Sequence, residues 1–208
     1  MTEIVVTGSA ERRLPADRAQ LQLSASNVGP QRPTVVADAG AVHERIVARA
    51  QRLVAEGSAE GYTAEAVTTY TSSWRDEHGT QIVEHRANVS VGIDLVALDQ
   101  VGPLTTEFAE AGIDANVSWK LSDPARDAVL RELRAEAVAD ARAAADDFAA
   151  ALGEPILALR ELRDSSVGRG VNPIGAPRFA MMADAGAAPE VTVHDIEVRV
   201  EIETRFGA

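Results

Sequence analysis

The sequence contains no cysteine among its 208 residues. This absence excludes disulfide bonds, zinc–thiolate sites, iron–sulfur clusters and a thiol nucleophile together. Histidine is also scarce, and none of the four histidines has the HExxH spacing that places two metal ligands on one helical face. The sequence therefore predicts no metal site and no cofactor.

Long apolar runs are missing as well. No segment reaches the ~18 consecutive apolar residues of a membrane-spanning helix. At the N-terminus, Thr2 and Glu3 lead directly into Ile4-Val5-Val6, without a basic stretch or an apolar run of signal-peptide length. From these features we expect no membrane insertion and a cytoplasmic location.

Basic residues are outnumbered, with 20 Lys and Arg against 32 Asp and Glu, which gives a formal net charge of −12. Such an acidic chain repels a phosphate backbone, and no cluster of Lys and Arg with interleaved aromatic residues counters that repulsion. Nucleic acid is therefore not an expected ligand.

Apolar residues make up 46% of the chain, enough for a self-sufficient core. No Pro/Gly/Ser-rich spacer interrupts the periodic segments before about residue 164, so we expect one structural unit over 1–208, either undivided or made of two lobes. Alternation of apolar and polar residues predicts strands with one buried face, which favours an antiparallel sheet. The expected strands cover about 4–7 (ended by a bend at Gly8), 19–26, 62–73, 83–95, 117–121, 156–162 and 196–206.

Helical spacing predicts three helices, at about 33–57, 97–111 and 124–152. The fold class is thus α+β, an antiparallel-rich sheet packed by helices. The third helix is rich in alanine and ~40 Å long at ~1.5 Å per residue, so it must span the whole sheet or project from it. Its small side chains would let another backbone approach closely. Its predicted apolar stripe contains Leu130, Leu133, Ala137, Ala141, Ala144, Phe148 and Leu152.

One long irregular segment, Ser165 to Pro189, is predicted to be a flexible loop, and loops of this length are usually functional or disordered. It carries Arg178-Phe179-Ala180-Met181-Met182, whose adaptable apolar groups suit either contact with another surface or folding back onto the chain's own core. The Gly168-Arg169-Gly170 run resembles the start of a dinucleotide fingerprint, but Pro173 replaces the third glycine. The candidate interaction residues are Arg169, Arg178, Phe179, Met181 and Met182.

Catalytic motifs are not apparent. The chain has neither a G-x-S-x-G elbow nor a GxxxxGK[ST] phosphate loop. The adjacent carboxylates Asp146 and Asp147 point about 100° apart on a helix, so they do not form an acid–base pair. No residue is predicted to be catalytic.

Several short motifs follow one another in a distinctive order. They start with Ile4-Val5-Val6-Thr7-Gly8 and Pro15-Ala16-Asp17-Arg18-Ala19, and they end with Ala151-Leu152-Gly153 and the valine-rich last strand. This order resembles the SIMPL-domain family, bacterial proteins similar to a signalling molecule that associates with a pelle-like kinase. It implies an α+β fold and a loose link to stress tolerance and to association with signalling proteins. It implies no catalytic residues, and many family members are periplasmic or envelope-associated.

Two functional hypotheses follow. The first is a non-enzymatic module that self-associates and binds protein partners through the 165–189 loop and the exposed part of the long helix. The alternative is a small-molecule-binding protein, or a hydrolase without a recognisable motif, whose site lies in a cleft.

Overall fold

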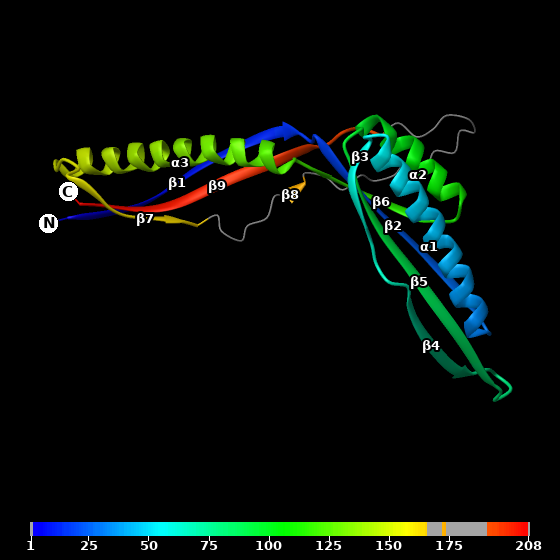
Figure 1. The fold of residues 1–208 in the computed structure, drawn as a ribbon. Coiled ribbons are helices and arrows are strands. Elements are labelled where there is room, and N and C mark those ends of the chain that lie inside the picture. Colours follow the sequence, from blue (N-terminus) through cyan, green and yellow to red (C-terminus); the bar gives the residue numbers. More distant parts are fainter. Residues whose placement is uncertain (1, 166–171, 174–190, 208) are drawn as a thin grey trace. The chain divides into compact units, whose positions relative to one another are not determined.

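The computed structural model describes residues 2–165, 172–173 and 191–207, which form two compact units (Figure 1). Each unit is an antiparallel sheet covered on one face by helix, so the predicted α+β class is confirmed. Unit 1 contains the described residues 2–16, 121–165, 172–173 and 194–207, and unit 2 contains 17–120 and 191–193.

Unit 1 is built on two long strands that pair along their whole length. Strand β1 aligns with β9 from Glu3↔Gly207 to Pro15↔Asp195, and β7 and the short β8 pair with the other edge of β9. The apolar face predicted for the last strand is buried. The elements of unit 1 are β1 (Glu3–Pro15), α3 (Asp123–Leu152), β7 (Ala158–Asp164), β8 (Asn172–Pro173) and β9 (Asp195–Gly207).

Helix α3 lies along β1 and β9 (Figure 1). Its 30 residues span about 45 Å at ~1.5 Å per residue, and the 13 residues of β1 span about 43 Å at ~3.3 Å per residue. The helix and the strands therefore match in length. Of the two alternatives left open by the sequence, the helix spans its sheet.

The helix approaches β1 very closely at Gly8. A Cβ atom at Gly8 would lie 2.1 Å from the carbonyl oxygen of Ala137 and 2.7 Å from the Cβ of Ala141. Gly8 pairs with Ile202 in the middle of a continuous strand, so the bend predicted there is wrong. The glycine instead provides the space in which the alanines of α3 pack against the strand.

The buried row of α3 differs from the predicted stripe at Leu130, which is only partly buried, and beyond Ala141. A row at four-residue steps turns by about 40° per step around a helix, and such a row can follow strands that twist. The predicted members Ala144, Phe148 and Leu152 lie outside this row. The buried row consists of Leu133, Ala137, Ala141, Ala145 and Ala149.

Unit 2 is a five-stranded sheet in the order β3-β5-β2-β6, with β4 paired to the first half of β5. The predicted extended run 62–73 is divided between β3 and β4, which pair with successive parts of β5. Helices α1 and α2 cover the face that carries the odd-numbered residues of β2 and β5. The elements are β2 (Arg18–Gly29), α1 (Arg32–Ala55), β3 (Ala59–Ala64), β4 (Thr68–Arg75), β5 (Gln81–Leu95), the 3₁₀ turn η1 (Leu98–Gln100), α2 (Val101–Glu110) and β6 (Asp114–Lys120).

The first and last strands of unit 2 are neighbours, because Arg18 in β2 is the partner of Lys120 in β6. Within the described ranges, no helix of either unit is long and apolar enough to cross a membrane.

Candidate interaction surface

The loop residues predicted to contact a partner, Arg169, Arg178, Phe179, Met181 and Met182, lie outside the described residues. Of the predicted interaction surface, the structure therefore describes the long helix. Because α3 lies flat on its sheet, its two flanks and its solvent face are the parts available for contact.

One flank of α3 faces the edge of β1 that pairs with no other described strand, and the first half of this flank is acidic. Glu132 and Glu136 both pair with the guanidinium of Arg12, which is in β1. One helical turn further, the Asp140 Oδ2 accepts a hydrogen bond of 2.9 Å from the backbone N–H of Ser9. The hydrogen bond to Glu132 and the negative charge of Glu136 raise the pKa of Arg12, so this guanidinium keeps its charge at any working pH.

The second half of the same flank is apolar. Ala144, Phe148 and Leu152 continue the row of Glu132, Glu136 and Asp140 at four-residue steps. Phe148 and Leu152 are 57% and 58% exposed, which is high for side chains of this size. Each four-residue step advances about 6 Å, nearly two strand residues, and α3 runs antiparallel to β1. Phe148 is therefore level with Ile4 and Val5, and Leu152 is level with Glu3.

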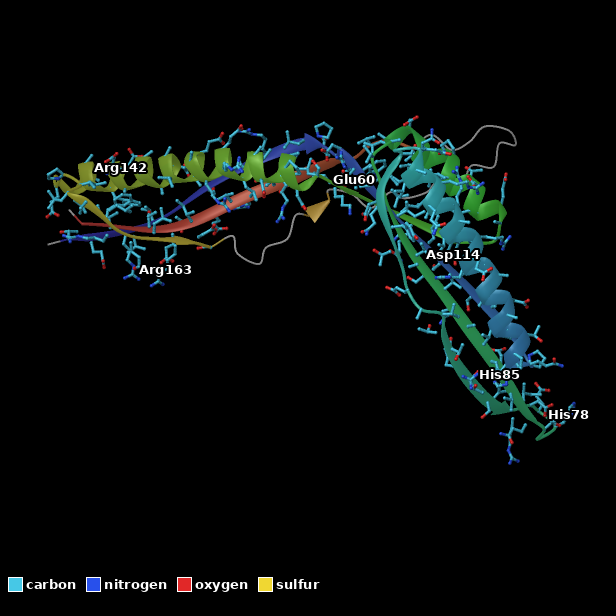
Figure 2. The ribbon with its side chains drawn as sticks, viewed as in Figure 1. Glu60, His78, His85, Asp114, Arg142 and Arg163 are labelled. Carbon is cyan, nitrogen blue, oxygen red and sulfur yellow. The ribbon has the colours of Figure 1, made fainter. Side chains whose placement is uncertain are left out.

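The opposite flank faces β7. Arg134 lies 3.9 Å from the carboxylate of Asp164. The Cζ of Arg142, which is labelled on α3 in Figure 2, lies 5.5 Å from the ring centroid of Phe206. Strand β7 itself adds further exposed leucines near the ends of β1 and β9. We call this end of the unit, where exposed apolar side chains lie on both flanks of α3 and on the sheet face away from it, the apolar end of unit 1. It consists of Val5, Phe148, Leu152, Leu157, Leu159 and Leu162.

The apolar end is a local feature of a strongly charged unit. On the sheet face away from α3, β9 carries charged side chains that pair with their neighbours: Arg13 with Glu197 at 3.2 Å, and Arg205 with Glu161 at 3.3 Å. Several exposed large apolar side chains at one end of such a charged unit mark a candidate contact surface.

The other candidate sites have fewer of the features of a functional site. The two histidines labelled in Figure 2, His78 and His85, lie in the β4–β5 hairpin, and His85 Nδ1 is 2.9 Å from the hydroxyl of Thr71. No group of three or more His, Asp and Glu side chains that could hold a metal ion occurs within residues 2–165, 172–173 and 191–207.

Unit 2 has an open groove of about 550 Å³ between α2 and the start of β6. The hydroxyls of Thr105 and Thr106 both donate to the carbonyl oxygen of Gly102, at 2.8 and 3.2 Å, and the other polar side chains that line the groove are Glu110 and Asp114. A small-molecule site typically has several polar groups pointing at one ligand position. This groove does not favour the cleft-site alternative.

The structure thus defines an α+β protein of two helix-covered antiparallel sheets, with an exposed apolar end as its most distinctive surface. The SIMPL family model, described as "Protein of unknown function (DUF541)", matches residues 4–206. The chain belongs to the SIMPL family, as the order of its motifs indicated. None of the curated proteins compared with it matches.

Proposed function

We propose that this chain is a non-enzymatic module that self-associates and binds protein partners, and that the apolar end of unit 1 is its contact surface. The observation that carries this proposal is the pair of exposed large apolar side chains, Phe148 and Leu152, on the flank of α3 beside β1, with four further exposed apolar side chains at the same end of unit 1. The loop residues Arg178 to Met182 stay a predicted second part of the surface.

Burial of Phe148 and Leu152 would make a measurable contribution to the free energy of binding. Full burial of a Phe or Leu side chain stabilises by ~1.5–3 kcal/mol. More than half of the surface of Phe148 and of Leu152 is still exposed. Covering both therefore contributes about 2 kcal/mol, on the order of 30-fold in Kd.

The test is the native mass of the chain by size-exclusion chromatography with light scattering, at two protein concentrations and two salt strengths. We expect an assembly larger than the 22.0 kDa monomer. The double variant Phe148→Asp/Leu152→Asp should dissociate to monomer, because association would bury two carboxylates in an apolar contact.

Val138→Asp is the matched control. Val138 is also an exposed apolar residue of α3, but it lies in the middle of the helix, outside the apolar end. It should leave the mass unchanged. A wild-type chain that stays monomeric at high concentration would remove self-association, and an assembly unaffected by the double variant would place the contact elsewhere.

A further inference from the structure

The free edge of β1 lies beside the apolar end. In the described part of unit 1, β1 pairs with β9 on one edge only. The Ser9 N–H points away from β9, because it reaches Asp140. Backbone groups of alternate residues point to the same edge of a strand, so the peptide groups of Glu3, Val5 and Thr7 also point outward.

This edge is protected in one half and open in the other. Proteins usually block a long edge strand with charged side chains, because an unpaired edge invites another strand. The carboxylate of Asp140 accepts the hydrogen bond of the Ser9 amide. Farther along β1, Arg12 forms ion pairs with Glu132 and Glu136. Along residues 3–7, the neighbouring flank of α3 instead carries Phe148 and Leu152. The protection ends where the apolar side chains begin.

We propose that residues 3–7 of β1 bind an extended segment of a partner protein as an added antiparallel strand, and that this segment has a basic residue followed by apolar residues two and four positions later. The proposal rests on the proposed function and specifies how the apolar end would be used. Main-chain hydrogen bonds to Val5 and Thr7 would supply affinity, and alternate side chains would supply specificity.

The side chains of the partner follow from the register. Paired residues share a face, so partner residues opposite Gly8, Val6 and Ile4 would point toward α3. The residue opposite Gly8 would lie near Asp140, on a flank where three carboxylates face one guanidinium. A Lys or Arg complements that charge. The residues opposite Val6 and Ile4 would lie beside Phe148 and Leu152, so they should be apolar.

The probe is a fluorescein-labelled, end-blocked peptide with the sequence Ser-Lys-Thr-Val-Thr-Val-Thr, titrated with the full chain and followed by fluorescence anisotropy. We expect saturable binding that weakens as salt increases. A peptide with Glu in place of Lys should bind more weakly, because it meets the acidic flank. A peptide with Pro between the two valines should bind more weakly, because it loses a main-chain donor.

The decisive variant is Thr7→Pro. Proline is tolerated on an edge strand where the N–H faces solvent, so the pairing with β9 is kept while one outward donor is removed. We expect about a tenfold loss of peptide affinity, because one hydrogen bond contributes up to about 1.5 kcal/mol. Thr7→Val keeps the N–H and should bind as the wild type does. Unchanged circular dichroism and melting would show that both variants are folded.

The outcomes separate the two proposals. Equal binding to wild type and Thr7→Pro, or no binding to wild type, would overturn strand addition. If strand addition were overturned but Phe148→Asp/Leu152→Asp still dissociated the assembly, the proposed function would stand without strand addition. If Thr7→Pro abolished self-association and the monomeric chain bound no peptide, the edge would belong to a second copy, and the basic-peptide partner would be wrong.

Discussion

At the scale of the residue, Gly8 sets the distance between α3 and β1. We expect Gly8→Ala to destabilise the chain by ~1–3 kcal/mol, because the new methyl group would overlap backbone atoms that cannot rotate away. The measurement is urea unfolding followed by circular dichroism. A loss smaller than the error of the method would show that α3 does not need this close approach.

The control for Gly8→Ala is Gly40→Ala. Gly40 lies inside α1, and a Cβ there meets nothing within 4 Å. Alanine costs less backbone entropy than glycine in a helix interior, so this variant should stabilise by ~0.5–1 kcal/mol. The two substitutions are chemically identical, so opposite signs would isolate the effect of packing.

Gly8 also shows where sequence reasoning fails at this scale. A glycine inside a strand pattern marks either a bend or a close backbone approach, and local sequence does not separate the two. The partner that decides the matter is Ala137, which is 129 positions away in the chain. The alanines of α3 did predict a close backbone approach, but nothing in their spacing indicated which backbone.

At the scale of the element, Asp140 protects part of the outer edge of β1, because its carboxylate accepts the hydrogen bond of the Ser9 amide. We expect Asp140→Ala to speed hydrogen exchange at the Ser9 amide about tenfold, since one charge-assisted hydrogen bond is lost. The neighbouring Ala10 amide should be unchanged, because its N–H points toward β9. Exchange measured by NMR resolves the two amides. Equal protection of Ser9 in both proteins would contradict the outward orientation assigned to Val5 and Thr7.

The sequence predicted the positions of the strands and helices better than it predicted which face of each one is buried. Strands such as β2, β5 and β9 were predictable because a two-residue alternation leaves little choice of buried side. In α3 the 3.6-residue stripe placed Phe148 and Leu152 in the same row as Leu133, whereas the buried row follows four-residue steps along the twisted strands. The apolar end was therefore missed. Extending the row of Leu133, Ala137 and Ala141 at four-residue steps would have shown that Phe148 and Leu152 fall outside the buried row.

At the scale of the whole molecule, all the strands and helices of unit 2 lie in one continuous stretch of the chain, residues 17–120, which has its own core. Large side chains of its strands and helices, including Leu21, Ile46, Ile93 and Leu104, are fully buried within 17–120. We expect residues 17–120, expressed alone, to fold as a monomer with one cooperative thermal transition. Circular dichroism and amide chemical-shift dispersion would test this, and a disordered spectrum would show that the stretch needs unit 1.

The two units also mark what sequence reasoning left open. The absence of a spacer before residue 164 allowed either an undivided unit or two lobes, because the crossings near residues 16 and 121 carry no run of glycine, proline or serine. Those crossings are short because β1 ends at Pro15 and β2 begins at Arg18, which leaves no room for a linker.

The pairing of Arg18 with Lys120 has a consequence for how such a protein can change. Paired residues of adjacent strands lie about 5 Å apart. The two ends of the stretch 17–120 are therefore close enough to be joined by a tight turn. Residues 17–120 are thus equivalent to one loop inserted between β1 and α3, while residues 191–193 join unit 2 through a separate crossing of the chain. A genetic exchange of this cassette for another domain with adjacent ends would keep β1, α3 and β9 in register. Unit 1, with its apolar end, would then carry a different inserted domain, so that the contact surface and the inserted domain can be chosen independently.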